Sequence, residues 1–140
     1  MGAFLFLHIM NIKLTILNGY FFLSLMAGFI IKIKFTSLLP VSSTYLYAFF
    51  VTIPLFILQF VSISSFSRKV KRGHPKLFKQ ACKRANGSSG SSINVATLFD
   101  ENKIFDQLKN PSLIREFHFV KRVVIFSMVS FLTLIVLYFV

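Results

Sequence analysis

The sequence predicts an all-α membrane protein with three transmembrane helices and one basic loop, and three observations support this. Hydrophobic residues make up 55% of the 140 residues and charged residues only 14%, whereas an ordinary globular chain carries about 25% charged residues. The apolar residues form blocks long enough to cross a bilayer core as helices. Thirteen of the sixteen Lys and Arg lie in one segment, 68–122, between two such blocks.

The N-terminal segment, 1–43, contains a predicted first transmembrane helix at 14–31. This range leaves out Lys13, because a charge near the centre of a span costs about 2.5–3.5 kcal/mol. A secretory signal peptide is the rival interpretation, but 1–13 lacks a charged start and no small-x-small cleavage site precedes Lys32. If translation began at Met26, this helix would be lost and two transmembrane helices would remain.

A second transmembrane helix is predicted at 44–66, which contains 23 residues and no charge. As a helix it would extend about 35 Å, enough to span a bilayer with some tilt. Pro54 should kink it, because the proline ring removes a backbone donor and clashes with the preceding turn. Gln59 should form a hydrogen bond to a neighbouring helix.

The basic loop, 67–122, is expected to contain short amphipathic helices. A first helix at 75–85 begins with Pro75 at the permissive first position, and its apolar side should lie along lipid headgroups. A flexible break at 86–92 follows, and then a helical stripe of apolar residues at 94–109. The candidate lipid headgroup contacts are the eight cations that begin the loop, in a stretch without acids: Arg68, Lys69, Lys71, Arg72, Lys76, Lys79, Lys83 and Arg84.

The last transmembrane helix is predicted at 123–140, where thirteen of eighteen residues are Val, Ile, Leu or Phe. Asn110 should cap a helix that runs through 113–120 directly into this span. Within the span, a hydroxyl recurs at every third position, and these residues are candidates for close helix packing: Ser127, Ser130 and Thr133. The alternative is that each hydroxyl bonds to the backbone of its own helix.

The positive charges of the loop predict its side of the membrane, because loops rich in Lys and Arg stay in the cytoplasm. Three spans then place the C-terminus outside. Tyr45, Tyr47 and Tyr138 would fall at the outer boundary, where amphipathic rings are favoured. Lys32 and Lys34 favour the opposite orientation of the first helix, since they would lie outside in this topology.

The residues offer little for catalysis, so we expect a protein that is not an enzyme and has no cofactor. Its three histidines, His8, His74 and His118, are far apart and lack a second ligand at helical spacing, so no metal site is expected. Cys82 is the only cysteine, which excludes an intrachain disulfide. The cations lie beside apolar spans and no nucleic-acid recognition motif accompanies them, so lipid explains them better than nucleic acid.

The order of features over about 44–140 resembles the universal stress protein B family, small bacterial inner-membrane proteins. The matching features are a span, a basic stretch, "HPKLFKQ", a Gly/Ser-rich break, a mixed-charge helix and "PSLIREFHFVKRVVIF" before a C-terminal span. Leu113-Ile114-Arg115 and Lys121-Arg122 would correspond to an apolar pair with arginine and to basic residues at the membrane edge. The resemblance implies a multi-pass protein of the bacterial inner membrane, linked by name to stress physiology, and implies no catalytic residues. The family has no helix corresponding to 14–31.

These patterns together predict a small inner-membrane protein that acts through its basic loop on anionic lipid or on a protein partner. An accessory subunit of a larger membrane complex is the first alternative, with Ser127, Ser130 and Thr133 packing on a partner. A membrane-permeabilising protein of the lysis type is the second, and a homo-oligomer is compatible with each.

Overall fold

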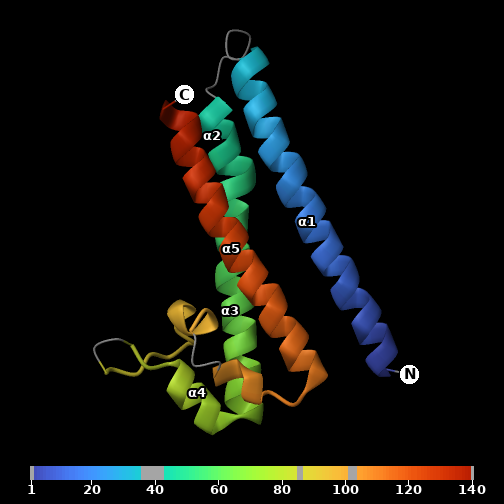
Figure 1. The fold of residues 1–140 in the computed structure, drawn as a ribbon, viewed down its shortest axis with the longest axis vertical. Coiled ribbons are helices and arrows are strands. Elements are labelled where there is room, and N and C mark those ends of the chain that lie inside the picture. Colours follow the sequence, from blue (N-terminus) through green and yellow to red (C-terminus); the bar gives the residue numbers. More distant parts are fainter. Residues whose placement is uncertain (1, 36–42, 85–86, 101–103, 140) are drawn as a thin grey trace. The chain divides into compact units, whose positions relative to one another are not determined.

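The computed structural model describes residues 2–35, 43–84, 87–100 and 104–139, and Figure 1 shows their fold. Within these ranges every regular element is a helix, and a single isolated bridge joins Lys83 to Ser89. Three helical stretches are long and apolar enough to cross a membrane, at Asn11–Lys34, Ser43–Gly73 and Pro111–Phe139. The predicted all-α class and the three long apolar helices are confirmed.

The first helix, α1 (Gly2–Phe35), is longer than the predicted 14–31 and continues through Lys13 without a break. The predicted range was limited to residues that fit within the hydrocarbon core. The helix extends beyond this range because no proline interrupts it and each added residue gains a backbone hydrogen bond. Lys13 is exposed on its surface.

The second stretch consists of three consecutive elements, α2 (Ser43–Tyr47), the π-helix η1 (Ala48–Thr52) and α3 (Ile53–Gly73). The π-turn directly precedes Pro54, and the N–H of Ile53 bonds to the carbonyl of Ala48, five residues earlier. In an α-helix the carbonyl of Phe50 would accept from residue 54, but proline has no N–H. The hydroxyl of Tyr20 donates to the Phe50 carbonyl instead. A π-turn thus precedes Pro54, and a side chain of α1 donates to the carbonyl four residues before the proline. The predicted kink at Pro54 stays a prediction.

The chain divides into two compact units. We call residues 11–59 and 123–140 the apolar unit, and residues 1–10 and 60–122 the basic unit. The helices α1, α3 and α5 (Pro111–Phe139) each contribute residues to both. The predicted continuity of the last helix from 113–120 into the final span is confirmed, and Asn110 caps it by accepting from the N–H of Ser112 at 2.9 Å.

Side chains of α1, η1 and α5 pack together in the apolar unit. Phe21 stacks on Phe126 with ring centroids 4.1 Å apart. Figure 1 shows the C-terminal part of α5 alongside α2, where the Thr44 hydroxyl donates to the carbonyl of Leu137 at 3.2 Å. Tyr45 and Tyr138 are exposed, as expected for rings at a membrane boundary, but Tyr47 is buried against Gly28.

The basic unit has an apolar interior formed by the second half of α3, the loop and the first turns of α5. Phe66 is fully buried and contacts Phe105 and Phe117, at centroid distances of 5.5 and 6.2 Å. Ser67 accepts a hydrogen bond from the N–H of Ile93 at 3.1 Å, which ties the loop to α3. The remaining buried apolar residues described in this unit are Ile63, Val70, Leu77, Ala81, Cys82, Ile93, Leu98, Leu108, Leu113 and Val120.

The stripe predicted at 94–109 is not one helix. The structure has two 3₁₀-helices there, η2 (Val95–Leu98) and η3 (Ile104–Gln107), and residues 101–103 lie outside the described ranges. Asn94 caps η2, and the segment is held on the end of α4, because the N–H of Asn94 and the hydroxyl of Thr97 donate to the carbonyl of Ala81 at 2.9 and 3.2 Å. A 3₁₀-helix has three residues per turn, so apolar side chains three positions apart still lie on the same side of it.

Candidate functional site: a cationic surface on the basic unit

The eight predicted cations lie on consecutive elements of the basic unit. Four are in the last turns of α3, two are on α4 (Pro75–Ala81), and Lys83 and Arg84 follow it. All eight side chains are exposed. No acid occurs in the sequence before Asp100, so the segment has no acidic residue of its own. We call Arg68, Lys69, Lys71, Arg72, Lys76, Lys79, Lys83 and Arg84 the cationic surface.

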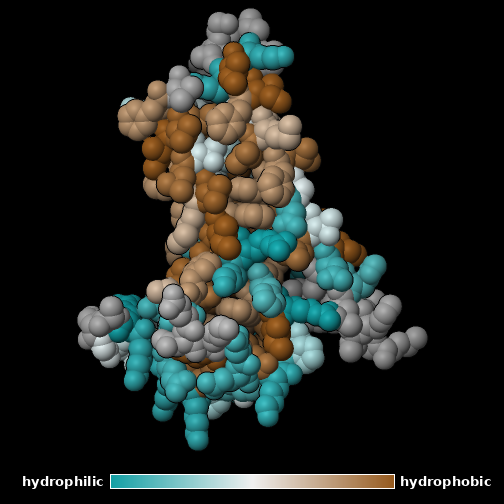
Figure 2. Space-filling view, in the orientation of Figure 1, coloured by the Kyte–Doolittle hydropathy of each residue, from teal (hydrophilic) through white to brown (hydrophobic). Residues whose placement is uncertain are grey.

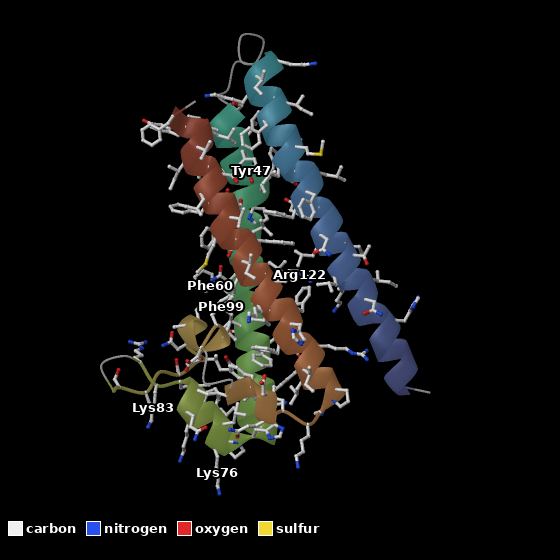
Figure 3. All side chains as sticks on the ribbon, viewed as in Figure 1. Tyr47, Phe60, Lys76, Lys83, Phe99 and Arg122 are labelled. Atoms are coloured by element: carbon white, nitrogen blue, oxygen red, sulfur yellow. The ribbon has the colours of Figure 1, made fainter. Side chains whose placement is uncertain are left out.

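The apolar side of α4 faces the interior of the basic unit, which corrects the expectation that it lies along headgroups. Leu77 and Ala81 are buried, and α4 packs against η3. The helix is also shorter than predicted, ending at Ala81 instead of 85. Figure 2 shows hydrophilic side chains gathered over α4, and in Figure 3 Lys76 and Lys83 extend away from it. The solvent-exposed side of α4 therefore carries its positive charges.

Lys69 differs from its neighbours because it is tied to α5. Its ammonium lies 2.7 Å from a carboxylate oxygen of Glu116, and its side chain is half exposed. Glu116 is buried, and Ser65 donates to its other oxygen at 3.4 Å. A buried carboxylate requires such partners, since an uncompensated buried charge is strongly destabilising. We therefore assign Lys69 to holding α3 on α5.

A second lysine of the surface makes a cation–π contact. The ammonium of Lys71 lies 5.8 Å from the ring centroid of Phe78, which joins the end of α3 to α4. Cys82, at the end of α4, is buried, and burial raises the pKa of its thiol while the charge of Lys71 partly opposes the rise. A thiol in this setting reacts slowly, because the thiolate is the nucleophile.

The turn after α4 folds back on the end of the cationic surface. The N–H of Arg84 donates to the carbonyl of Ser88 at 2.9 Å, and the N–H of Gly90 donates to the carbonyl of Cys82 at 2.9 Å. Gly87 has a φ of 80°, the left-handed region that glycine adopts without strain. Residues 87–92, predicted as a flexible break, thus form a hydrogen-bonded turn; Asn86 lies outside the described ranges.

The hydroxyls of Ser127, Ser130 and Thr133 are in the apolar unit and are turned into it. Ser130 pairs with Thr52 at 3.0 Å. Ser127 donates to the side-chain oxygen of Gln59, which is the interhelical bond expected of that glutamine. Thr133 bonds to the carbonyl of Val129 in its own helix at 2.9 Å. Because these residues are buried inside the chain, they offer no packing surface to a second protein.

Two features of the apolar unit were missed by reasoning from sequence. One is the Tyr20 bond to Phe50, for which the signal was available: a proline inside a span leaves a carbonyl four residues earlier without a donor. The other is the close approach of Tyr47 to Gly28. A glycine in an apolar helix often marks a close helix contact, but its partner cannot be identified from spacing.

Nothing in the described ranges points to a metal centre. No group of three or more His, Cys, Asp or Glu side chains that could hold a metal ion occurs there. His8 and His118 are exposed.

The fold and the surface define a class: a small helical protein with three candidate membrane-spanning helices and an exposed cluster of cations at and after the end of the second. No family model, curated protein or solved structure matches this chain. The resemblance to the universal stress protein B family therefore stays a prediction.

Proposed function

We propose that this chain is a non-enzymatic integral protein of the bacterial inner membrane whose cationic surface binds anionic lipid headgroups on the cytoplasmic side. The observation that carries the proposal is the combination found at α4, where both cations are exposed while Leu77 and Ala81 are buried. A cytoplasmic location follows from the rule that Lys-rich and Arg-rich loops are retained inside. The inner membrane and a link to stress physiology follow from the resemblance.

The mode of binding is electrostatic. An amphipathic helix that lies in the interface inserts its apolar face into the lipid, but Leu77 and Ala81 are occupied inside the basic unit. Attraction to anionic headgroups contributes about 1 kcal/mol for each Lys or Arg near the surface. With Lys69 engaged by Glu116, seven cations remain for this contact, and binding should weaken strongly as salt is raised.

Native mass spectrometry of the full chain in detergent tests the lipid contact. We expect phosphatidylglycerol to bind more tightly than phosphatidylcholine with the same acyl chains. The variant K76Q/K79Q/K83Q should lose about a hundredfold of this affinity, at about 1 kcal/mol for each of three charges and about 1.4 kcal/mol per tenfold. The matched control K13Q/K34Q/K109Q removes exposed cations elsewhere and should bind as the wild type does. Equal binding of the two lipids by the wild type would refute the proposal.

The sidedness of the surface is tested separately. Reporter fusions after residues 38, 90 and 140 should place residue 90 in the cytoplasm and residues 38 and 140 outside. An impermeant thiol reagent needs a reactive cysteine, and Cys82 is a poor one because it is buried and the pKa of its thiol is raised. Ser92→Cys in a Cys82→Ala background gives an exposed probe, since Ser92 is exposed. Labelling of this probe from outside intact cells would show that the loop lies outside, opposite to the predicted topology.

A further inference from the structure

The serine-rich turn at 88–92 lies directly against the end of the cationic surface. Its backbone bonds to Arg84 and Cys82, and Ser89 forms the bridge with Lys83. The guanidinium of Arg84 lies beside Gly90, where an added Cβ would be 3.6 Å from Nε. Ser88, Ser89, Ser91 and Ser92 are all exposed. Hydroxyls that a modifying enzyme can reach are therefore held beside two of the cations proposed to contact lipid.

We propose that this turn is a phosphorylation site, with Ser89 and Ser91 as the acceptors, and that phosphorylation releases the cationic surface from anionic lipid. The inference rests on the proposed lipid contact and adds its regulation. The donor would be ATP, used by a serine kinase that recognises basic residues on the N-terminal side of its target. The charge pattern fits such an enzyme, since Lys83 and Arg84 precede the serines and no acid occurs before Asp100.

The reaction is an ordinary phosphoryl transfer. The serine Oγ forms a bond to the γ-phosphorus of ATP, the bond from that phosphorus to the bridging oxygen breaks, and ADP leaves. The hydroxyl proton passes to a base of the kinase, and nothing is oxidised or reduced. The reaction requires the predicted cytoplasmic side, because that is where ATP is available.

The consequence follows from charge. Each phosphate adds about −1.5 to −2 charges at neutral pH and three strong acceptor oxygens. Placed on Ser89 or Ser91, it would pair with Lys83 and Arg84, the cations on which the turn is folded. Two phosphates would cancel about three to four charges, so about half of the surface would be neutralised. Release of a polybasic segment from lipid by phosphorylation is a known type of electrostatic switch.

Two measurements test this proposal on the full chain. Mass spectrometry of the protein isolated from its native cells should find phosphate within 88–92. Lipid titration should show that S89D/S91D binds phosphatidylglycerol about tenfold more weakly than the wild type, whereas the neutral, similarly shaped S89N/S91N binds normally. In a K83Q/R84Q background the aspartates should have a much smaller effect, because their partners are gone.

The outcomes separate this inference from the proposed function. If the wild type prefers phosphatidylglycerol but S89D/S91D binds it unchanged, or if no phosphate is found on 88–92 under any growth condition, the switch is refuted and the lipid contact stands. If the wild type has no preference for phosphatidylglycerol, the lipid contact fails first. Circular dichroism of each variant excludes unfolding as the cause of a loss.

Discussion

The apolar unit and the basic unit are built from the same helices but differ in the contacts that join α3 to α5. In the apolar unit, side chains of η1 and α3 meet α5 through neutral polar pairs, Thr52 with Ser130 and Gln59 with Ser127. In the basic unit the contact is mostly apolar, with Phe66 against Phe117, and its buried carboxylate, Glu116, is paired with the half-exposed Lys69. The proposed membrane location of the apolar unit would account for the difference. In hydrocarbon, apolar side chains gain little by leaving the lipid, so hydrogen bonds and close packing join helices, whereas in water burial of apolar surface does.

The largest effect should come from the interior of the basic unit. Phe66→Ala removes a fully buried ring that contacts Phe105 and Phe117, and such a truncation costs about 3–5 kcal/mol. Hydrogen exchange of amides 67–99 should accelerate accordingly. Phe60→Ala is the control, because that ring is 69% exposed. Equal effects of the two variants would show that the basic unit has no apolar core of its own.

Close packing in the apolar unit should be the next most sensitive feature. Gly28→Ala would place a Cβ 2.7 Å from the Tyr47 ring, and overpacking of this kind costs about 1–3 kcal/mol. Thermal unfolding in detergent should occur at a lower temperature. Gly19→Ala in the same helix has nothing within 4 Å of the new Cβ and should leave the midpoint unchanged or raise it. A tolerated Gly28→Ala would contradict the contact.

The polar pairs of the apolar unit should contribute less. A double-mutant cycle with Gln59→Leu and Ser127→Ala should give a coupling energy of about 0.6 kcal/mol, and at most about 1.7 kcal/mol, the range for hydrogen bonds between membrane helices. Gln59→Leu with Ser130→Ala is the matched cycle, since Ser130 pairs with Thr52 instead, and should show no coupling. A null result in the first cycle would leave packing as the sole cause of the helix contact.

The smallest coupling energy should come from the ion pair of Lys69 with Glu116, because solvent around the lysine screens it. Lys69 is half exposed, and pairs of this kind are worth about 0–1 kcal/mol. A cycle of Lys69→Met with Glu116→Gln should detect that coupling in unfolding experiments. Lys79→Met removes an exposed cation of α4 and should leave stability unchanged while weakening lipid binding. If Lys69→Met reduced lipid binding as strongly as Lys79→Met does, the distinction between the two lysines would be wrong.

The long apolar helices, the Asn110 cap, and Pro75 at the first position of α4 could all be predicted, because each depends on neighbours in the sequence. The stripe at 94–109 could not. Its apolar spacing suits a helix, but Asn94 and Thr97 donate hydrogen bonds to Ala81 of α4, and the segment forms two separate 3₁₀-helices. The place of Tyr47 near the start of the predicted second span could be read from the sequence. Its burial against Gly28, 19 positions earlier in the sequence, could not.

The sequence by itself determined which segments are apolar enough to span a membrane and where the positive charge is concentrated, because hydropathy and charge add up residue by residue. Only the tertiary structure decided how individual side chains are used. It turned Leu77 and Ala81 inward, paired Lys69 with Glu116, and directed Ser127 and Ser130 to partners in their own chain. Those outcomes depend on residues distant in the sequence, since a helix face acquires its role from the element packed against it.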